Sequence, residues 1–93
     1  MDCFIRTKII NNSDRFSSGI GSAVEFTVPK TGKVNLMLSE KNGRKICTLI
    51  NNEFLKKGFY LKELDLSNLP VGDYCYNLKS NNIERTKDLR IFK

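Results

Sequence analysis

The chain has 93 residues, which is enough for one small domain with a core of its own. Hydrophobic residues make up 40% of the chain and charged residues 28%, values that exclude an intrinsically disordered protein. The formal net charge is +6, but the cations are spread along the sequence and no apolar run is long enough for a membrane span, so the composition favours neither nucleic acid nor a bilayer as a partner.

The N-terminal third, residues 1–22, is predicted to be an extension of the domain. A strand is possible over Cys3–Ile10. Residues 11–22 are rich in Ser, Asn and Gly and predict a long loop, with Phe16 and Ile20 as its apolar anchors. The N-terminus lacks the apolar core of a secretory signal, so we expect a protein that stays where it is made or a mature domain.

Two segments that alternate between apolar and polar side chains, residues 23–29 and 33–40, predict half-buried strands. Asn42-Gly43 then predicts a type I′ hairpin turn in which both residues have positive φ. The return strand is expected over residues 45–50, with a bulge or burial on both faces at Leu49-Ile50. The apolar positions of these strands are expected to face one core: Val24, Phe26, Val28, Val34, Leu36, Leu38 and Ile46.

Residues 51–58 are predicted to form a connecting loop, with Phe54 or Leu55 packed beneath it. The strand that follows, residues 59–64, has two possible facings. Phe59 and Leu61 share one face, whereas Tyr60 and Leu64 share the other with Lys62 between them. Both facings remain open because the apolar residues occupy both sides of the strand.

The segment Leu69–Leu78 predicts a turn that leads directly into a strand. Pro70 presets the φ of a turn position, and Gly72 is expected to adopt a positive φ. Alternating residues follow, and a turn over residues 80–82 leads to a last strand over residues 84–92. The apolar positions of these two strands are expected inside: Tyr74, Tyr76, Leu78, Leu89 and Ile91.

About seven short strands with hairpin connections predict an all-β fold, an immunoglobulin-like antiparallel β-sandwich over residues 23–93. The chain has no Trp, so the Cys-Trp-Cys spacing of antibody domains is missing. Four residues are expected to act as structural turns: Asn42, Gly43, Pro70 and Gly72.

The three cysteines, Cys3, Cys47 and Cys75, show no C-x-x-C spacing, and the chain has no histidine. We therefore expect neither a metal site nor a cofactor. A Cys47–Cys75 disulfide remains open, and the alternative is that all three are free, half-buried thiols.

Catalysis is not expected, because an enzyme needs a positioned base, nucleophile or metal. Glu63 and Asp65 form a close carboxylate pair, but we expect them to be solvated on a strand face. Tyr60, Tyr74 and Tyr76 suggest either a stacking surface for sugars or bases, or core positions.

Several motifs, in order, resemble one known family. Residues Val24–Val34 (VEFTVPKTGKV) resemble its IEFxLPxxGxV opening, and Asn42–Leu49 (NGRKICTL) its NGRxVxxL hairpin. Gly58–Asp65, Leu69–Tyr74 (LPVGDY) and Thr86–Lys93 (TKDLRIFK) match its next strand, its LPxGxY turn and its TKKLVxxK tail. The family is the C-terminal sorting domain of type IX secretion cargo, the Por secretion tail of Bacteroidetes, which is related to the immunoglobulin-like domain of the flagellar hook-capping protein.

The resemblance implies a non-catalytic domain that the outer-membrane export machinery recognises through its last strand and basic tail. It implies a secreted or cell-surface location if the chain is a piece of an exported cargo. Ser13–Phe16 replaces the family's Pro-Asn-Pro-Phe segment, and Asp88 interrupts the basic tail. The residues expected to recognise the partner are Lys87, Leu89, Arg90, Ile91, Phe92 and Lys93.

Two alternatives remain beside the sorting domain. A free-standing accessory or decoration subunit of a larger particle, such as a phage virion, or an adhesin would place the chain in an assembly, and the missing export signal favours it. A nucleic-acid-binding β-protein is disfavoured by the dispersed charge. We therefore expect a protein partner, either export machinery or assembly neighbours, with the oligomeric state open.

Overall fold

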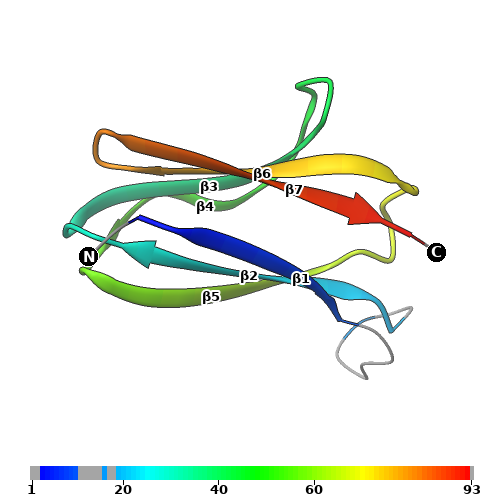
Figure 1. Cartoon of the computed structure of the whole chain (residues 1–93), viewed down its shortest axis with the longest axis horizontal. Coiled ribbons are helices and arrows are strands. Elements are labelled where there is room, and N and C mark those ends of the chain that lie inside the picture. The colour runs from blue at the N-terminus through cyan, green and yellow to red at the C-terminus, as the bar shows by residue number, and fades with distance from the viewer. Residues whose placement is uncertain (1–2, 11–15, 17–18, 93) are drawn as a thin grey trace.

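A computed structural model describes residues 3–10, 16 and 19–92 as two packed antiparallel sheets (Figure 1). The strand order is β1-β2-β5 in one sheet and β4-β3-β6-β7 in the other. The seven strands are β1 (Ile5–Ile10), β2 (Gly21–Val28), β3 (Gly32–Glu40), β4 (Lys45–Leu55), β5 (Gly58–Asp65), β6 (Gly72–Ser80) and β7 (Ile83–Ile91). The predicted all-β, immunoglobulin-like sandwich is confirmed.

A tyrosine corner marks the start of β6, the first strand after the chain crosses from the three-stranded sheet to the four-stranded sheet. The Tyr74 hydroxyl donates to the Pro70 carbonyl, four residues upstream, at 2.7 Å. Immunoglobulin-like domains use this contact at the same place, near the start of the strand that follows the last crossover. The LPVGDY segment is therefore a local lock on the β5–β6 connection.

The core lies between the two sheets and includes nearly every predicted position. Ile46 is only partly buried, because the register between β3 and β4 shifts beside it and Cys47 takes the place opposite Leu38. The core also contains residues that were not predicted to lie there: Cys3, Ile50 and Leu66. Across it, the Tyr76 hydroxyl donates to the Ser22 hydroxyl at 3.0 Å, and burial raises the pKa of this tyrosine.

The N-terminal strand that was possible from sequence is confirmed as β1. It pairs antiparallel with β2, and Cys3 just before it is buried in the core, so this part of residues 1–22 belongs to the sandwich. The predicted loop lies largely outside the described residues. Its anchor Ile20 packs against the core, and the Phe16 ring lies against Gly21, where an added Cβ would sit 2.2 Å from it.

Strand β4 continues to Leu55, so the predicted loop over residues 51–58 is wrong for its first part. The expected bulge is confirmed: Leu36 pairs with Ile50 and Met37 with Thr48, which leaves Leu49 as the extra residue. A second irregularity lies at Asn52, whose φ is 51° and whose amide donates to the Asn35 side chain at 2.7 Å. Bulges let one strand carry extra residues while its neighbour stays regular.

The facing of β5 is decided by its pairing with β2. Tyr60 lies opposite Phe26 and their rings stack at 5.6 Å, so Tyr60 and Leu64 pack against the core. Phe59 and Leu61 therefore lie on the outer face and are exposed.

Two turn predictions are corrected. Gly43 has a φ of 98°, but Asn42 does not have a positive φ. The Glu40 carbonyl accepts the Gly43 amide, and the Asn42 side chain accepts the Arg44 amide, so an ordinary turn followed by a left-handed glycine replaces the type I′ turn. Gly72 does not have a positive φ either, because it already belongs to β6.

The three cysteines are free thiols. Strand β3 separates the strands that carry Cys47 and Cys75. Cys47 faces the core opposite Leu38, whereas Cys75 lies between Tyr74 and Tyr76 and faces outward, so this fold cannot bridge them.

Replacing Tyr74 by Phe should lower the free energy of unfolding by about 1 kcal/mol, since the half-buried Pro70 carbonyl loses its donor. Tyr60→Phe is the matched control: it removes an exposed bond to the Lys56 carbonyl, also four residues upstream, and should change stability by under about 0.5 kcal/mol. Urea denaturation measures both. Equal losses of stability in the two variants would show that the Tyr74–Pro70 hydrogen bond contributes no more than an exposed one.

Gly43→Ala should destabilise the protein by about 1 kcal/mol, because the positive φ strains a side chain although the space around it is open. Gly72→Ala should be neutral or stabilise by about 0.5 kcal/mol, since its Cβ would meet the nearest atom, Tyr74 Cε2, at an ordinary 3.7 Å. Denaturant melts of the two variants decide. A larger loss at Gly72 would contradict this assignment of the turns.

Candidate functional site

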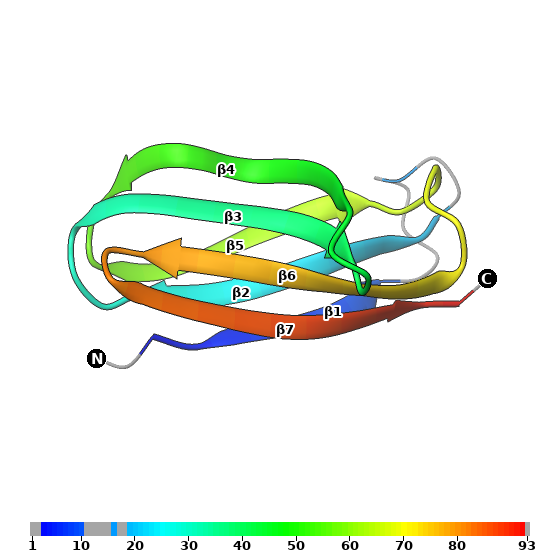
Figure 2. The same ribbon diagram turned by 90° about the horizontal axis from the view of Figure 1, so that it is seen from above.

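The last strand, β7, lies at an edge of the four-stranded sheet. It pairs with β6, and among the described residues no other strand is bonded to its outer side. Strand β1 of the other sheet runs alongside it (Figure 2). The strand expected to be recognised is therefore at an edge of its sheet, where its outward-facing side chains meet solvent.

The six residues expected to recognise a partner are divided by the β6–β7 register. Leu89 lies opposite Tyr74 and Ile91 opposite Gly72; both are buried, so their side chains belong to the core and contact no partner of the folded domain. Lys87, Arg90 and Phe92 are exposed. Lys93 lies outside the described residues.

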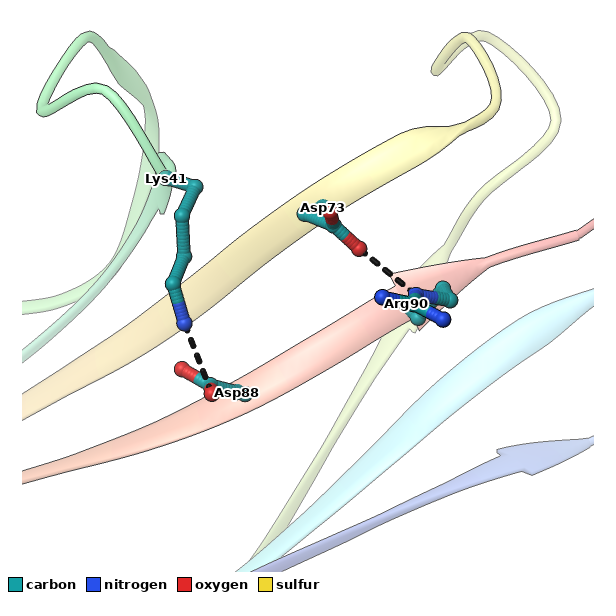
Figure 3. Close-up of polar contacts among 4 residues, drawn as sticks. All are labelled: Lys41, Asp73, Asp88 and Arg90. Carbon is teal, nitrogen blue, oxygen red and sulfur yellow. Dashed lines mark hydrogen bonds and ion pairs between the residues drawn. The ribbon is translucent and has the colours of Figure 1, made fainter.

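Two ion pairs on the outer face of this sheet connect β7 to two other segments (Figure 3). Arg90 Nε donates to Asp73 Oδ1 at 2.7 Å, which joins β7 to β6, and this hydrogen bond raises the pKa of Arg90. Lys41 Nζ lies 2.7 Å from Asp88 Oδ2, which joins the β3–β4 hairpin to β7. That hydrogen bond holds the pKa of Asp88 below, and the pKa of Lys41 above, the ordinary value.

The β3–β4 hairpin reaches this position because its tip rises from the sheet and bends over β6 (Figures 1 and 2). The Lys41 amide donates to the Asp73 carbonyl at 3.1 Å and fixes the base of the tip. Shallow grooves lie on both sides of Asp73, between the hairpin and Pro70 and between Lys41 and Arg90.

An apolar pair borders these charges. Gly72 and Ile91 are the last pair of the β6–β7 ladder. Val71, just before Gly72, and Phe92, just after Ile91, lie beyond that pair and are 60% and 69% exposed. We call the set Val71, Phe92, Asp73, Arg90, Lys41 and Asp88 the β7-end surface. It combines exposed apolar side chains with two ion pairs that leave no net charge.

The sequence analysis identified Arg90 and Phe92 as recognition residues but not the other four members of this surface, Val71, Asp73, Lys41 and Asp88. The sequence does contain a signal for Asp73, the partner of Arg90 on β6. A two-residue turn at Asn81-Asn82 pairs Ser80 with Ile83, and counting back along both strands places Asp73 opposite Arg90. Lys41 had no such signal, since the bend of the hairpin over the sheet is set by tertiary contacts.

The backbone edge of β7 carries charged side chains that oppose pairing with a further strand. Arg85 and Lys87 lie opposite Leu78 and Tyr76, so they occupy positions on the core-facing side of the strand, yet both are exposed. Charged residues at inward positions of an edge strand oppose strand addition. Side chains of the β7-end surface are thus better suited to recognition than the backbone.

The other candidate residues of the sequence analysis lie elsewhere in the fold. Tyr74 and Tyr76 are buried, so the three tyrosines form no stacking surface. Glu63 and Asp65 lie on the outer face of β5. Within residues 3–10, 16 and 19–92, no three metal-ligating side chains gather. The described part of the chain has no helix with the length and apolarity to cross a membrane.

Comparison of the sequence with known protein families and with curated proteins gives no match. The assignment of a function therefore depends on the β7-end surface and on the motifs that build it.

The carboxyl group of Asp88 should titrate below the ordinary aspartate range, and Lys41→Ala should return its pKa to that range. Because the folded pKa is lowered, the pair stabilises the fold above the pKa of the unfolded carboxyl, and this contribution is lost as the pH falls through the folded value. Carboxyl NMR titration measures the shift. Lys45→Ala, in the same hairpin, is the control, and an unchanged Asp88 pKa in Lys41→Ala would contradict the contact.

Proposed function

We propose that this chain is a non-catalytic immunoglobulin-like domain that a protein partner recognises through the β7-end surface, and that it acts as a sorting domain for type IX secretion. The observation that carries the proposal is the exposed end of the last strand. There Arg90 and Phe92 lie outside, beside Val71 and Asp73 from the segment before β6 and the start of β6.

Three of the five family-like motifs support the proposal, because the segments that carry them meet at this one surface. The LPVGDY segment supplies Val71, Asp73 and the tyrosine corner, and the tail supplies Arg90 and Phe92. The NGR hairpin places Lys41 against Asp88, so the Asp that departs from the basic tail has a partner here. Segments that are far apart in sequence thus build a single recognition element.

An accessory subunit of a larger particle is the second candidate. A specific observation favours it: Phe4, Phe59 and Leu61 are exposed on the outer face of the other sheet. A particle subunit needs more than one contact surface, whereas a sorting domain that is read at its last strand needs one. Exposed apolar patches commonly mark protein contacts.

The test places the whole chain behind an exported reporter in a cell with type IX secretion. The unchanged fusion should reach the surface, and Arg90→Ala with Phe92→Ala should lower the surface fraction about tenfold, since a cation and an aromatic anchor are lost. Deleting the last strand is unsuitable because Leu89 and Ile91 are core residues.

The matched control is Lys33→Ala with Phe54→Ala. These residues also form an exposed pair of a cation and an aromatic ring on neighbouring strands, at the opposite edge of the same sheet. The control should be exported like the unchanged fusion. Equal export of both double variants would disprove recognition at the β7-end surface. An unexported wild-type fusion, together with binding of the purified chain to a particle, would support the accessory subunit instead.

A further inference from the structure

The outer face of the β1-β2-β5 sheet carries an apolar cluster at one end. Phe4, Phe59 and Leu61 are 37%, 60% and 54% exposed, and the two phenylalanine rings lie 6.2 Å apart. Thr27 lies between them and is buried. Arg6 covers part of the Phe4 ring, with its guanidinium carbon 5.7 Å from the ring centre. These side chains lie on the opposite sheet from the β7-end surface.

The strand register arranges this face in rows that cross the three strands. The apolar row contains Phe4 and Phe59, with Thr27 between them. A second row runs Arg6, Glu25, Leu61, and a third runs Lys8, Ala23, Glu63. In the second and third rows, the β1 side thus carries the cations Arg6 and Lys8, and the β5 side carries Leu61 and Glu63.

From this arrangement we infer that a second copy of the chain docks on this face, related by a two-fold axis that runs along β2. Such a rotation exchanges the β1 and β5 sides and keeps each row in place. Phe4 then meets Phe59 of the second copy, and Lys8 meets Glu63 of the second copy, and each contact occurs twice. The contacts are self-complementary, as a two-fold interface requires.

A hollow on the face fits the same arrangement. Arg6, Thr7, Lys8, Ala23 and Glu25 line it, because Ala23 leaves space in the middle strand. Glu63 of the second copy reaches this hollow, where Lys8 is its opposite charge and Arg6 is already paired with Glu25 of its own chain. Glu63 also has an interaction within its own chain.

The two copies of Glu25 face each other at the axis without opposing the association. Each is paired with Arg6 of its own chain at 2.7 Å. Two aligned sheets also pack face to face with their strands about 30° apart, so the side chains of neighbouring rows interdigitate.

A second copy explains this face better than a lipid surface does. An anionic membrane attracts clustered cations, whereas here the cations Arg6 and Lys8 share one small face with the carboxylates of Glu25 and Glu63. The face is only three strands wide, whereas a standard interface buries roughly 800 Å² on each partner. The dimer is therefore expected to be weak and concentration-dependent.

Sedimentation of the full chain over a concentration series tests the inference. The wild type should dimerise below about 1 mM. Phe59→Ser should weaken association at least about tenfold. Phe54→Ser, which alters an equally exposed phenylalanine on the other sheet, should leave it unchanged. Dimers that survive Phe59→Ser, or that are lost with Phe54→Ser, would place the interface elsewhere.

Charge exchange gives the sharper test. Lys8→Glu and Glu63→Lys should each weaken self-association about tenfold, since each reversal faces two like charges across the interface. The two variants mixed together should associate again as a heterodimer, because every Lys8–Glu63 contact is then complementary. Mixing without recovery, or a wild type that stays monomeric to about 1 mM, overturns the inference. Export of the Phe59→Ser fusion is unaffected in either case, so the outcome is separate from that of the proposed function.

Discussion

The pairing of β6 with β7 is the constraint on which the rest of this molecule depends. The turn at Asn81-Asn82, where Asn81 has a φ of 57°, brings Ser80 opposite Ile83 and determines the register of both strands. A slip by one residue would turn Leu89 and Ile91 out of the core and carry Arg90 inside. The β6–β7 register therefore determines which side chains of β7 enter the core and which form the β7-end surface.

Three of the edge strands, β7, β5 and β4, carry features that oppose the addition of a further strand. Arg85 and Lys87 guard β7, and Lys62 occupies a core-facing position on β5 but is exposed. Strand β4 is interrupted by bulges along its pairing with β3. Inward charges and bulges both oppose the addition of a further strand. The two proposed contact surfaces accordingly lie on the end and the outer face of sheets.

Part of the positive charge of the chain is neutralised by ion pairs on the sheet surfaces. Within the described part of the chain, cations pair with carboxylates on the same sheet surfaces: Arg6 with Glu25, Lys41 with Asp88, Lys79 with Glu84 and Arg90 with Asp73. Exposed pairs of this kind add little to stability. Their value here is local neutrality beside exposed apolar side chains, which suits a protein partner.

The strands, their inward faces and most of the core could be read from the sequence, because alternation with period two and the chemistry of short turns are local properties. The bulge at Leu49 and the place of Asp73 opposite Arg90 follow from the same local rules. Tertiary structure decided the facing of β5, the extension of β4 to Leu55 and the φ of Asn42. It also decided the reach of Lys41 to Asp88, since that contact requires the hairpin to bend over a strand more than thirty residues away in the chain. Contacts between segments that are distant in sequence leave no periodic signal, so packing alone determines them.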